Sequence, residues 1–372
     1  MAQPRLRIAF VGDVCLGMAT RDHIAGHGVD YPFDPTHDLL ADAHLRVGNL
    51  ECILVDPART PDWQKFALSL PSDRAGGLTG AGFEVVSLAN NHMMDAGPAG
   101  LDETRRWLDA AGIRHFGAGP DRRAAEATLF HEVEGRTLAF LGVCDADYYF
   151  AGRDSPGIAP LDVRALGARI RAARNDADLV IVALHADLEF TYHPSRPRVR
   201  YSRWLAEQGA HLLWEHHPHV FQGIEHHAGA LISYSSGNFV FEAGEYMKNE
   251  EGVRDTFVLH VDVDFTGKTP ALTWQAHPAV IGGDARPVPV AEHDRAAHLE
   301  RLARISADLA RPTVLRRVWR QRAWRQLRFE CKDVYYALRR GRFGLAARTI
   351  GSILRHRRHR RWLVGALTAG LR

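Results

Sequence analysis

The sequence lacks the features of a disulfide-stabilised secreted domain and of a membrane-spanning protein. Its four cysteines are scattered over 372 residues without a Cys-x-x-Cys pair, which argues against a disulfide framework. No uninterrupted apolar run approaches the roughly 20 residues that a transmembrane helix needs. The apolar run after Arg7 is also too short for a signal sequence. These absences predict a soluble, cytoplasmic protein with reduced thiols and no membrane anchor.

Charge is divided unevenly along the chain. Residues 311–372 hold 18 of the 47 basic residues but only two of the 44 acidic ones, Glu330 and Asp333, so this segment carries a charge of +16. Residues 1–310 keep the other 29 basic and 42 acidic residues and carry −13. We therefore expect an acidic body over residues 1–310 and a basic helical extension over residues 311–372.

The basic extension has apolar side chains at helical spacing. These are Leu327, Cys331, Val334, Tyr335 and Leu338. One interpretation is an amphipathic helix that packs on the acidic body. The alternative is a surface for an anionic membrane or an acidic polymer, formed by arginines and by Trp319, Trp324 and Trp362. Specific nucleic-acid binding is not expected, because no recognition module surrounds the charge.

Strands and helices alternate in the body, and hairpins follow. Hydrophobic patterning predicts buried strands at residues 5–11, 45–50, 84–88, 178–184, 211–214 and 230–234. It predicts antiparallel strands at 127–133 with 137–143, and at 256–264 with 271–275. Helices are expected at 99–111, 161–174 and 201–208. This pattern indicates an α/β protein with a mixed sheet system flanked by helices.

Polar side chains gather where the predicted strands end. They are Asp13, Glu51, Asn91, His92, His185, His217 and His219. The carboxyl ends of strands in α/β sheets converge on one edge, so these residues are expected to meet there. Carboxylates, an amide and imidazoles suit Zn, Mn, Fe, Mg or Ca, and no thiolate is needed. The sequence therefore predicts a site for a divalent metal ion.

Histidines are numerous and clustered. The chain has 21, and six of them lie between His211 and His227. A single histidine is more often a surface or core residue than a ligand, but clustering at ligand spacing favours a metal site. Alternate residues of an extended segment point the same way, and the proline of His217-Pro218-His219 stiffens that segment. This segment is the most specific element of the predicted site.

Five motifs, in order, make the chain resemble the CapA family of capsule and poly-γ-glutamate synthesis proteins. They are Gly12-Asp13, Asn49-Leu50-Glu51, Ser87-Leu88-Ala89-Asn90-Asn91-His92 with Asp95 and Gly97, His217-Pro218-His219, and Tyr234-Ser235-Ser236-Gly237-Asn238-Phe239. The resemblance covers about residues 5–245. This family is a branch of the calcineurin-like metallophosphoesterase superfamily, so the resemblance implies a four-layer αββα sandwich.

The same resemblance implies roles for individual residues. The implied metal ligands are Asp13, Asn91, His185, His217 and His219. Asn49 and Glu51 occupy the loop where a phosphoesterase carries its metal-bridging aspartate, which makes them further ligand candidates. His92 would be an acid/base or electrostatic group beside the metal. A metal held there could lower the pKa of bound water or stabilise a developing oxyanion.

The chain departs from the related patterns at three places. Phosphoesterases have Asp-x-His after the first strand, whereas Val14 and Cys15 follow Asp13 here. The glycine in the family's His-Trp-Gly-x-Glu is Asp187, and the glycine before its His-His-Pro-His is Glu215. The first departure and the replacement of the bridging aspartate weaken the case for a dinuclear phosphoesterase. The two added acids could orient imidazoles, act in catalysis, or be exposed loop residues.

The function predicted on this basis is that of a metal-dependent enzyme acting on a peptide or a γ-glutamyl polymer. The favoured reaction is Cα epimerisation, as the family's lasso-peptide branch implies. It needs acid/base groups on both faces of Cα and a cation for the enolate. Candidate groups are Asp13, His92, Asp95, His185 and Asp187. The alternatives are a capsule or poly-γ-glutamate biosynthesis protein, a metal-dependent phosphoester hydrolase and a non-catalytic scaffold.

Overall fold

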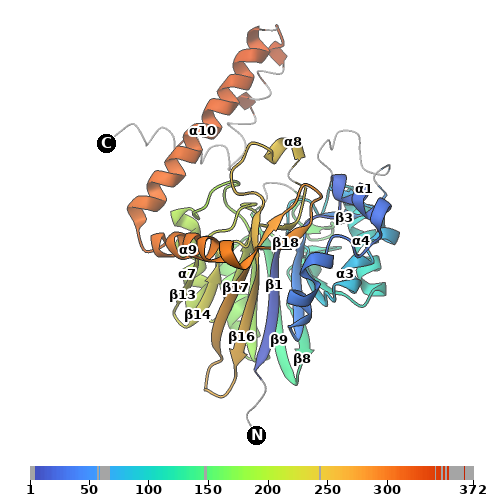
Figure 1. Ribbon diagram of the computed structural model, residues 1–372, viewed down its shortest axis with the longest axis vertical. Helices are drawn as coiled ribbons and strands as arrows, with labels where there is room; N and C mark the ends of the chain where they lie inside the picture. Colours follow the sequence, from blue (N-terminus) through green and yellow to red (C-terminus); the bar gives the residue numbers. More distant parts are fainter. Residues whose placement is uncertain are drawn as a thin grey trace.

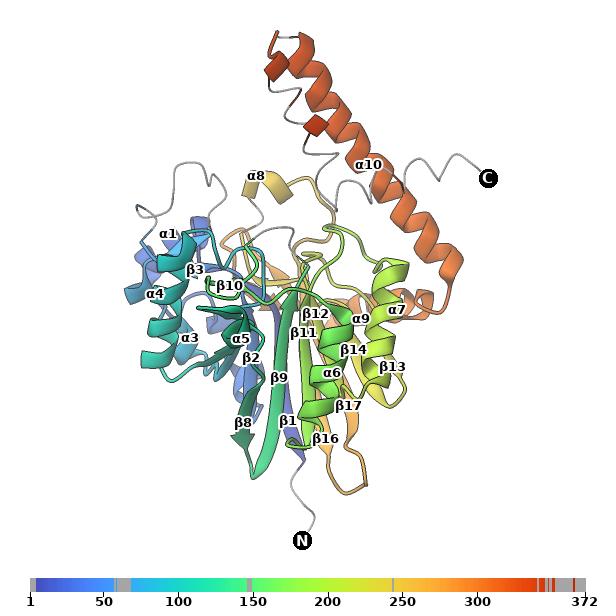
Figure 2. The same cartoon turned by 180° about the vertical axis from the view of Figure 1, so that it is seen from behind.

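Two β-sheets stacked face to face form the centre of the molecule (Figures 1 and 2). The computed structural model describes residues 5–56, 58, 68–145, 149–242, 244–339, 341–344, 347, 350, 351 and 364. Within these residues, helices cover the outer faces of both sheets.

The first sheet has eight strands in the order β18-β17-β16-β1-β2-β5-β6, and β15 pairs with the far end of β1. β1, β2, β5 and β6 are parallel, whereas β16, β17 and β18 are antiparallel. The strands are β1 (Leu6–Val14), β2 (Leu45–Leu50), β5 (Val85–Ser87), β6 (Arg114–Phe116), β15 (Asn238–Val240), β16 (Asp255–Asp264), β17 (Ala271–Ile281) and β18 (Pro287–Pro289).

The second sheet has six strands in the order β13-β14-β12-β11-β9-β8, with antiparallel strands at its two edges. The strands are β8 (Leu129–Val133), β9 (Arg136–Cys144), β11 (Leu179–His185), β12 (Leu212–His216), β13 (Ile224–His227) and β14 (Ala230–Ser233). Two short pairs lie outside the sheets. They are β3 (Ile53–Leu54) with β4 (Ser69–Leu70), and β7 (Ala118–Gly119) with β10 (Gly157–Ile158).

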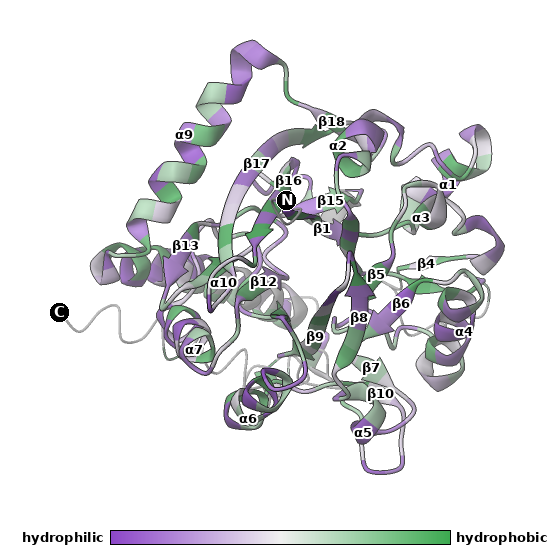
Figure 3. Cartoon of the chain, turned by 90° about the horizontal axis from the view of Figure 1, so that it is seen from below, coloured by the Kyte–Doolittle hydropathy of each residue, from purple (hydrophilic) through white to green (hydrophobic). Residues whose placement is uncertain are grey.

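The outer layers are helical (Figure 3). Beside the first sheet lie α1 (Met18–His27), α2 (His37–Ala41), α3 (Gly77–Gly80) and α4 (Gly97–Ala110), and beside the second lie α6 (Val163–Ala173) and α7 (Arg196–Glu207). The remaining helices are α5 (Arg122–Ala125), α8 (Gly244–Met247), α9 (Glu292–Asp308) and α10 (Pro312–Arg339). This order of layers confirms the predicted αββα sandwich.

An apolar core between the two sheets joins them. Phe10 of β1 and Trp214 of β12 are fully buried, with ring centroids 5.4 Å apart. The indole N–H of Trp214 donates to the carbonyl oxygen of Val11 at 3.1 Å, so its polar atom is satisfied within the core. Phe10 and Trp214 lie midway along their strands. Their contact holds the two sheets together a few residues before the strand ends where the polar residues gather.

Most predicted strands are confirmed, including the hairpin of β8 and β9, but several boundaries differ, and the strand predicted at 271–275 continues to Ile281. The helix predicted at 201–208 begins at Arg196, because Ser195 accepts a hydrogen bond from Arg198 N and Pro197 favours the first turn. The first strand continues to Val14. Asp13 therefore lies within β1 and not after it.

The basic extension begins as a long helix, α10, that rises from α9 past the body (Figure 1). Its first half rests on the body, because Leu315 and Ala323 are buried and Arg322 pairs with Glu250 at 3.3 Å. The division at residue 311 stays a prediction, and Trp362 lies outside the described residues. In the described chain, α10 included, each helix is too short or too polar to span a bilayer.

His211 is expected to make the fold sensitive to acid. Its Nδ1 accepts the Val180 N–H at 2.8 Å, and burial and the charge of Arg174 lower the pKa of His211 to about 4. The unfolded chain, with a pKa near 6.5, therefore binds more protons between these values, and stability falls as pH falls through this range. The loss attributable to His211 is at most about 3 kcal/mol. Thermal melts from pH 7 to 4.5 should be less pH-dependent in His211→Asn than in the wild type, and equal dependence would contradict this prediction.

Candidate metal centre

The candidate site lies where parallel strands of both sheets end. Asp13 of β1 is in register with Asn49 of β2, and His185 of β11 is in register with His216 of β12. The two pairs meet across the gap between the sheets, where His216 Nδ1 lies 2.8 Å from Asp13 Oδ1. The stacking of the sheets thus brings together side chains that are some 200 residues apart in the sequence.

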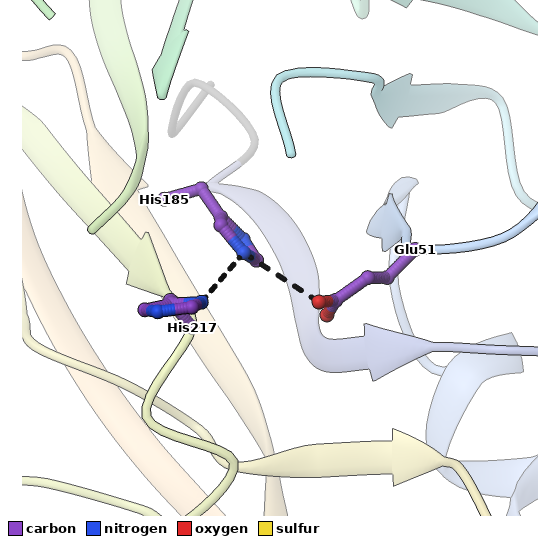
Figure 4. A group of neighbouring side chains, drawn as sticks. All are labelled: Glu51, His185 and His217. Atoms are coloured by element: carbon purple, nitrogen blue, oxygen red, sulfur yellow. Dashed lines mark hydrogen bonds and ion pairs between the residues drawn. The ribbon is translucent and has the colours of Figure 1, made fainter. Parts of the chain in front are cut away.

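The first group of potential ligands consists of Glu51, His185 and His217 (Figure 4). His185 Nε2 lies 3.1 Å from His217 Nδ1 and 3.5 Å from Glu51 Oε1. Asn91 Oδ1 lies 2.8 Å from the same nitrogen. Ligand atoms bound about 2.1 Å from one metal ion are separated by roughly 3 to 3.5 Å. The distances from His185 to His217 and Glu51 therefore fit ligands converging on a single cation, whereas the 2.8 Å to Asn91 is a hydrogen-bond distance.

The second group consists of Asp13, Glu51 and His219. His219 Nδ1 lies 3.6 Å from Asp13 Oδ2, and Asp13 is completely buried. Glu51 belongs to both groups, so its carboxylate lies between them. Such an arrangement suits one cation or two cations that share Glu51.

The chemistry of Glu51 tests whether a cation fits. The side chain has no exposed surface, and neither carboxylate oxygen has a hydrogen-bond partner among the described residues. Burial and the nearby negative charge of Asp13 raise the pKa of Glu51 well above its usual range. A buried, unsatisfied carboxylate is costly unless a positive charge compensates it. The donor set therefore fits a divalent cation bound at Glu51.

Asp13 and His185 are held in the protonation states that ligands need. Burial raises the pKa of Asp13, but His216, His219 and the hydrogen bond from Asn49 lower it, and the net direction is downward. Burial, followed by the charges of His217 and His216, lowers the pKa of His185 well below its usual range. An ionised Asp13 and a neutral His185 each offer lone pairs to a metal.

The His-Pro-His segment is not extended, which corrects the prediction for its backbone. His217 and His219 have φ values of 97° and 55°, in the left-handed region that residues other than glycine rarely adopt. Because of these turns, the two imidazoles serve different groups, with ring centroids 6.0 Å apart. The unusual backbone is consistent with a site whose geometry the surrounding structure imposes.

The amide side chains of Asn49 and Asn238 orient two of the potential metal ligands. Asn49 donates to Asp13 Oδ1 at 2.8 Å and accepts from Asn90, so both ends of its amide are engaged. Asn238 Oδ1 lies 2.9 Å from His219 Nδ1, so this amide orients the ring of His219. Asn49 stays a predicted ligand, and its contacts here are those of a residue that positions Asp13.

His92 lies at the edge of the site. Its Nδ1 is 2.9 Å from Asp95 Oδ2, and its side chain is 19% exposed, whereas Asp95 is buried. Asp95 Oδ2 also accepts the N–H of Leu68. A carboxylate that holds one ring nitrogen fixes the tautomer and leaves the other nitrogen for proton transfer. His92 is therefore the imidazole best placed to meet a substrate.

Glu215 is fully buried and Asp187 is partly buried, so the interpretation of exposed loop residues was wrong. Asp187 Oδ2 accepts the N–H of Ser195 at the start of α7, at 2.6 Å. Glu215 pairs with Arg198 at 2.6 Å and accepts a hydrogen bond from Ser202. Neither carboxylate belongs to the two ligand groups. A catalytic role for Asp187 stays untested, while its contacts link it to α7.

Three residues of the site belong to the motifs or to the histidine cluster, but the sequence assigned them no role. They are Asn90, His216 and Asn238. His216 was missed because alternation along an extended segment would place it opposite His217. Asn90 and Asn238 lie within motifs that also contain ligand candidates. Their amides could have been recognised only from the packing of several strand ends.

Comparisons with known proteins agree with the motifs. The profile of the family described as bacterial capsule synthesis protein PGA_cap matches residues 7–243. The capsule biosynthesis protein CapA of Bacillus anthracis is 30% identical over 251 residues, which are 64% of this chain and 61% of that protein. The chain thus spans less than two thirds of the length of this relative.

Two further proteins are similar. The PGA biosynthesis protein CapA of Bacillus subtilis (strain 168) is 28% identical over 287 residues, which are 75% of each chain. Among solved structures, a 5'-nucleotidase precursor from Thermus thermophilus has a TM-score of 0.46 and 14% identity. The match covers 83% of this chain and 60% of that one.

Proposed function

Because the chain belongs to the bacterial capsule synthesis protein PGA_cap family, we propose that it takes part in capsule or poly-γ-glutamate synthesis as a divalent-metal-dependent enzyme acting on γ-glutamyl chains. The names of its relatives support this role over the epimerisation favoured by the sequence, because neither CapA relative is named as an epimerase. That a divalent metal acts in this site, and that the γ-glutamyl amide is the bond acted on, are both parts of this proposal.

The single observation that supports an enzyme is the position of Glu51. A buried carboxylate without hydrogen-bond partners, shared by two ligand groups, is a poor structural element and a good metal ligand. Asp13, Asn91, His185, His217 and His219 would complete the coordination. A divalent metal bound there would supply a Lewis acid for the substrate carbonyl or an acidified water.

The pair of His92 and Asp95 would move the proton. Asp95 is buried and oriented by Leu68 N–H, so it holds His92 in one tautomer. With its partly exposed side chain, His92 can donate a proton to the leaving nitrogen of a γ-glutamyl amide or accept one from water. For His92 to act as proton donor or as proton acceptor, the substrate carbonyl must lie next to the buried metal ligands.

We infer that α10 receives the acidic polymer. One face of this helix is exposed along its length and carries four cations and two aromatic rings. Its residues are Arg317, Gln321, Trp324, Arg328, Lys332, Tyr335 and Arg339. Near the start of the helix, Arg322 lies over the ring of Phe190, which stacks with His219. The helix thus begins beside the site.

The exposed face of α10 can be tested by binding. Neutralising Arg317, Arg328 and Lys332 with glutamine should weaken the salt-sensitive binding of labelled poly-γ-glutamate at least tenfold, since each lost cation removes an ionic contact. Unchanged binding of the polymer, or loss confined to anionic lipid vesicles, would contradict this inference.

Cα epimerisation remains a second candidate because an imidazole and a carboxylate border the site from different loops. His92 pairs with Asp95 at 2.9 Å, and Glu189 Oε1 lies 3.7 Å from Nε2 of the potential ligand His217. Epimerisation needs one such group to remove a proton from Cα and another to return it on the opposite face. Hydrolysis or transfer of a γ-glutamyl amide needs only one such proton-transfer group.

One experiment separates these reactions. Purified protein of measured metal content is incubated in heavy water with γ-glutamyl oligomers and, in parallel, with p-nitrophenyl phosphate. New amine ends from the oligomer, lost in His92→Gln, are the expected result. Deuterium at Cα without cleavage supports epimerisation, and phosphate release supports a phosphoesterase. A protein that binds metal but changes neither compound, or binds none, would contradict the proposed enzyme and favour a scaffold.

A further inference from the structure

Beneath the candidate metal centre lies a buried guanidinium, that of Arg198. This residue stands in the first turn of α7 and is fully buried. Its Nε donates to Glu215 Oε2 at 2.6 Å. Asp187 is a second negative neighbour that favours the charged form of Arg198. A fully buried arginine and glutamate beside a partly buried aspartate form a costly arrangement that needs a physical reason.

The remaining contacts of Arg198 are with backbone carbonyls at the ends of three parallel strands. Its terminal nitrogens donate to the carbonyl oxygen of Ala186, to that of Tyr234 at 2.9 Å, and to that of His216 at 3.4 Å. Ala186 directly follows β11, Tyr234 directly follows β14, and His216 is the last residue of β12. One planar group thus links three neighbouring strand ends of the second sheet.

Two of these carbonyls belong to neighbours of potential metal ligands. Ala186 follows His185, and His216 precedes His217. The N–H of Ala186 also donates to the carbonyl oxygen of His216 at 3.2 Å, so the two strand ends are joined directly and through Arg198. The position of the guanidinium therefore fixes the separation of the two imidazoles of the first ligand group.

The acids that replace the family's two glycines both serve this arrangement. Glu215 balances the charge of Arg198 and is itself fixed by Ser202 Oγ at 2.5 Å. Asp187 keeps a backbone that suits glycine, with φ of 90°, and its carboxylate caps the start of the helix that carries Arg198. Aspartate tolerates this region better than most residues. Both departures from the family pattern thus point to the same guanidinium.

We propose that Arg198, held by Glu215 and Asp187, is a positioning residue that sets the geometry of His185 and His217 for metal binding. This inference rests on the proposed metal site but not on the reaction or its substrate. In this proposal the charged groups hold the backbone beside the metal ligands in place, and they do not contact the substrate. Arg198 should then control metal affinity more strongly than it controls the stability of the metal-free fold.

The test replaces the buried pair without leaving an isolated charge. In Arg198→Met/Glu215→Leu, both charges are removed, and such replacements of buried ion pairs are often neutral for stability. We expect the chelator-treated variant to melt within a few degrees of the wild type, while its affinity for Zn²⁺ or Mn²⁺ falls 10- to 100-fold, as for residues that orient ligands. Affinity is measured by competition with a chromophoric chelator.

A matched pair on the same helix provides the control. Arg203 of α7 pairs with Glu225 at 2.7 Å, away from the carbonyls beside His185 and His217. Arg203→Met/Glu225→Leu should therefore leave metal affinity unchanged. Equal affinity losses in both double variants, or no loss in a folded Arg198→Met/Glu215→Leu protein, would overturn the proposal.

A conservative variant covers the case in which the double variant does not fold. Arg198→Lys keeps the charge opposite Glu215, but a single ammonium group cannot reproduce the planar set of bonds to three carbonyls. Metal affinity should fall several-fold with little change in melting temperature, and an unchanged affinity would refute the positioning role. If the wild type itself binds no divalent metal, the proposed metal-dependent function fails, whereas altered affinity without any catalysis leaves the positioning role intact.

Discussion

Replacing His217 with alanine is expected to remove tightly bound divalent metal from the protein. Its Nδ1 lies 3.1 Å from His185 Nε2, and both rings are buried beside the unpaired carboxylate of Glu51. Loss of a direct ligand should cost more than the 10- to 100-fold that loss of an orienting residue costs. Elemental analysis after gel filtration should therefore show at least one equivalent less metal, and turnover of the γ-glutamyl substrate should fall in parallel.

Two further variants sharpen this prediction. His219 belongs to the other ligand group, so His219→Ala should also lower metal content, and a remaining equivalent in both single variants would indicate two cations. His226 is an exposed residue of the same histidine-rich segment, and His226→Ala should keep the full metal content. If the His217→Ala protein binds metal as the wild type does, the assignment of the site is incorrect.

The fold was predictable because its strands are strongly patterned. β9 and β11 contain long continuous apolar stretches, and β1 contains a shorter one, as parallel strands covered on both faces require. The layer order, however, came from the resemblance to the CapA family. Patterning alone gave a mixed sheet system, because periodicity does not state which strands share a sheet.

Short or irregular elements escaped prediction for local reasons. β15 has three residues and pairs with the far end of β1, so its existence depends on a partner more than 200 residues away. α1 follows Gly17 without a side-chain cap, and no apolar periodicity marks its start. The early start of α7 was signalled by Ser195 and Pro197, two residues whose capping meaning is visible in the sequence.

The potential metal ligands were named from the sequence, but the residues that orient them and the geometry of the site were not. Motif order identified the residues of both ligand groups, since strand ends in such folds share one edge. The sharing of Glu51 by these groups depends on the distance between the two sheets, which a packed core containing Phe10 and Trp214 determines. The left-handed backbone of His217 and His219 likewise follows from tertiary constraints that no local pattern records.

Glu51→Gln should have opposite effects on metal binding and on the stability of the metal-free protein. Glutamine has nearly the shape of glutamate but cannot carry a negative charge, so it should reduce metal affinity more than 100-fold, since it removes the charge shared by both ligand groups. In chelator-treated protein the same change removes an unsatisfied buried carboxylate, which costs about 1 to 3 kcal/mol. The variant should then melt a few degrees higher than the wild type.

The pH dependence of this difference in melting temperature provides a second check. The pKa of Glu51 is raised in the folded state, so the folded protein binds this proton more tightly than the unfolded chain does. Stability of the metal-free wild type should therefore fall as pH rises from 4.5 through the folded pKa, while the glutamine variant lacks this term. The gap between their melting temperatures should widen with pH, and excess metal should reverse it by stabilising only the wild type. A gap that is absent at high pH, or that metal leaves unchanged, would show that Glu51 is not the unpaired charge at the centre of this site.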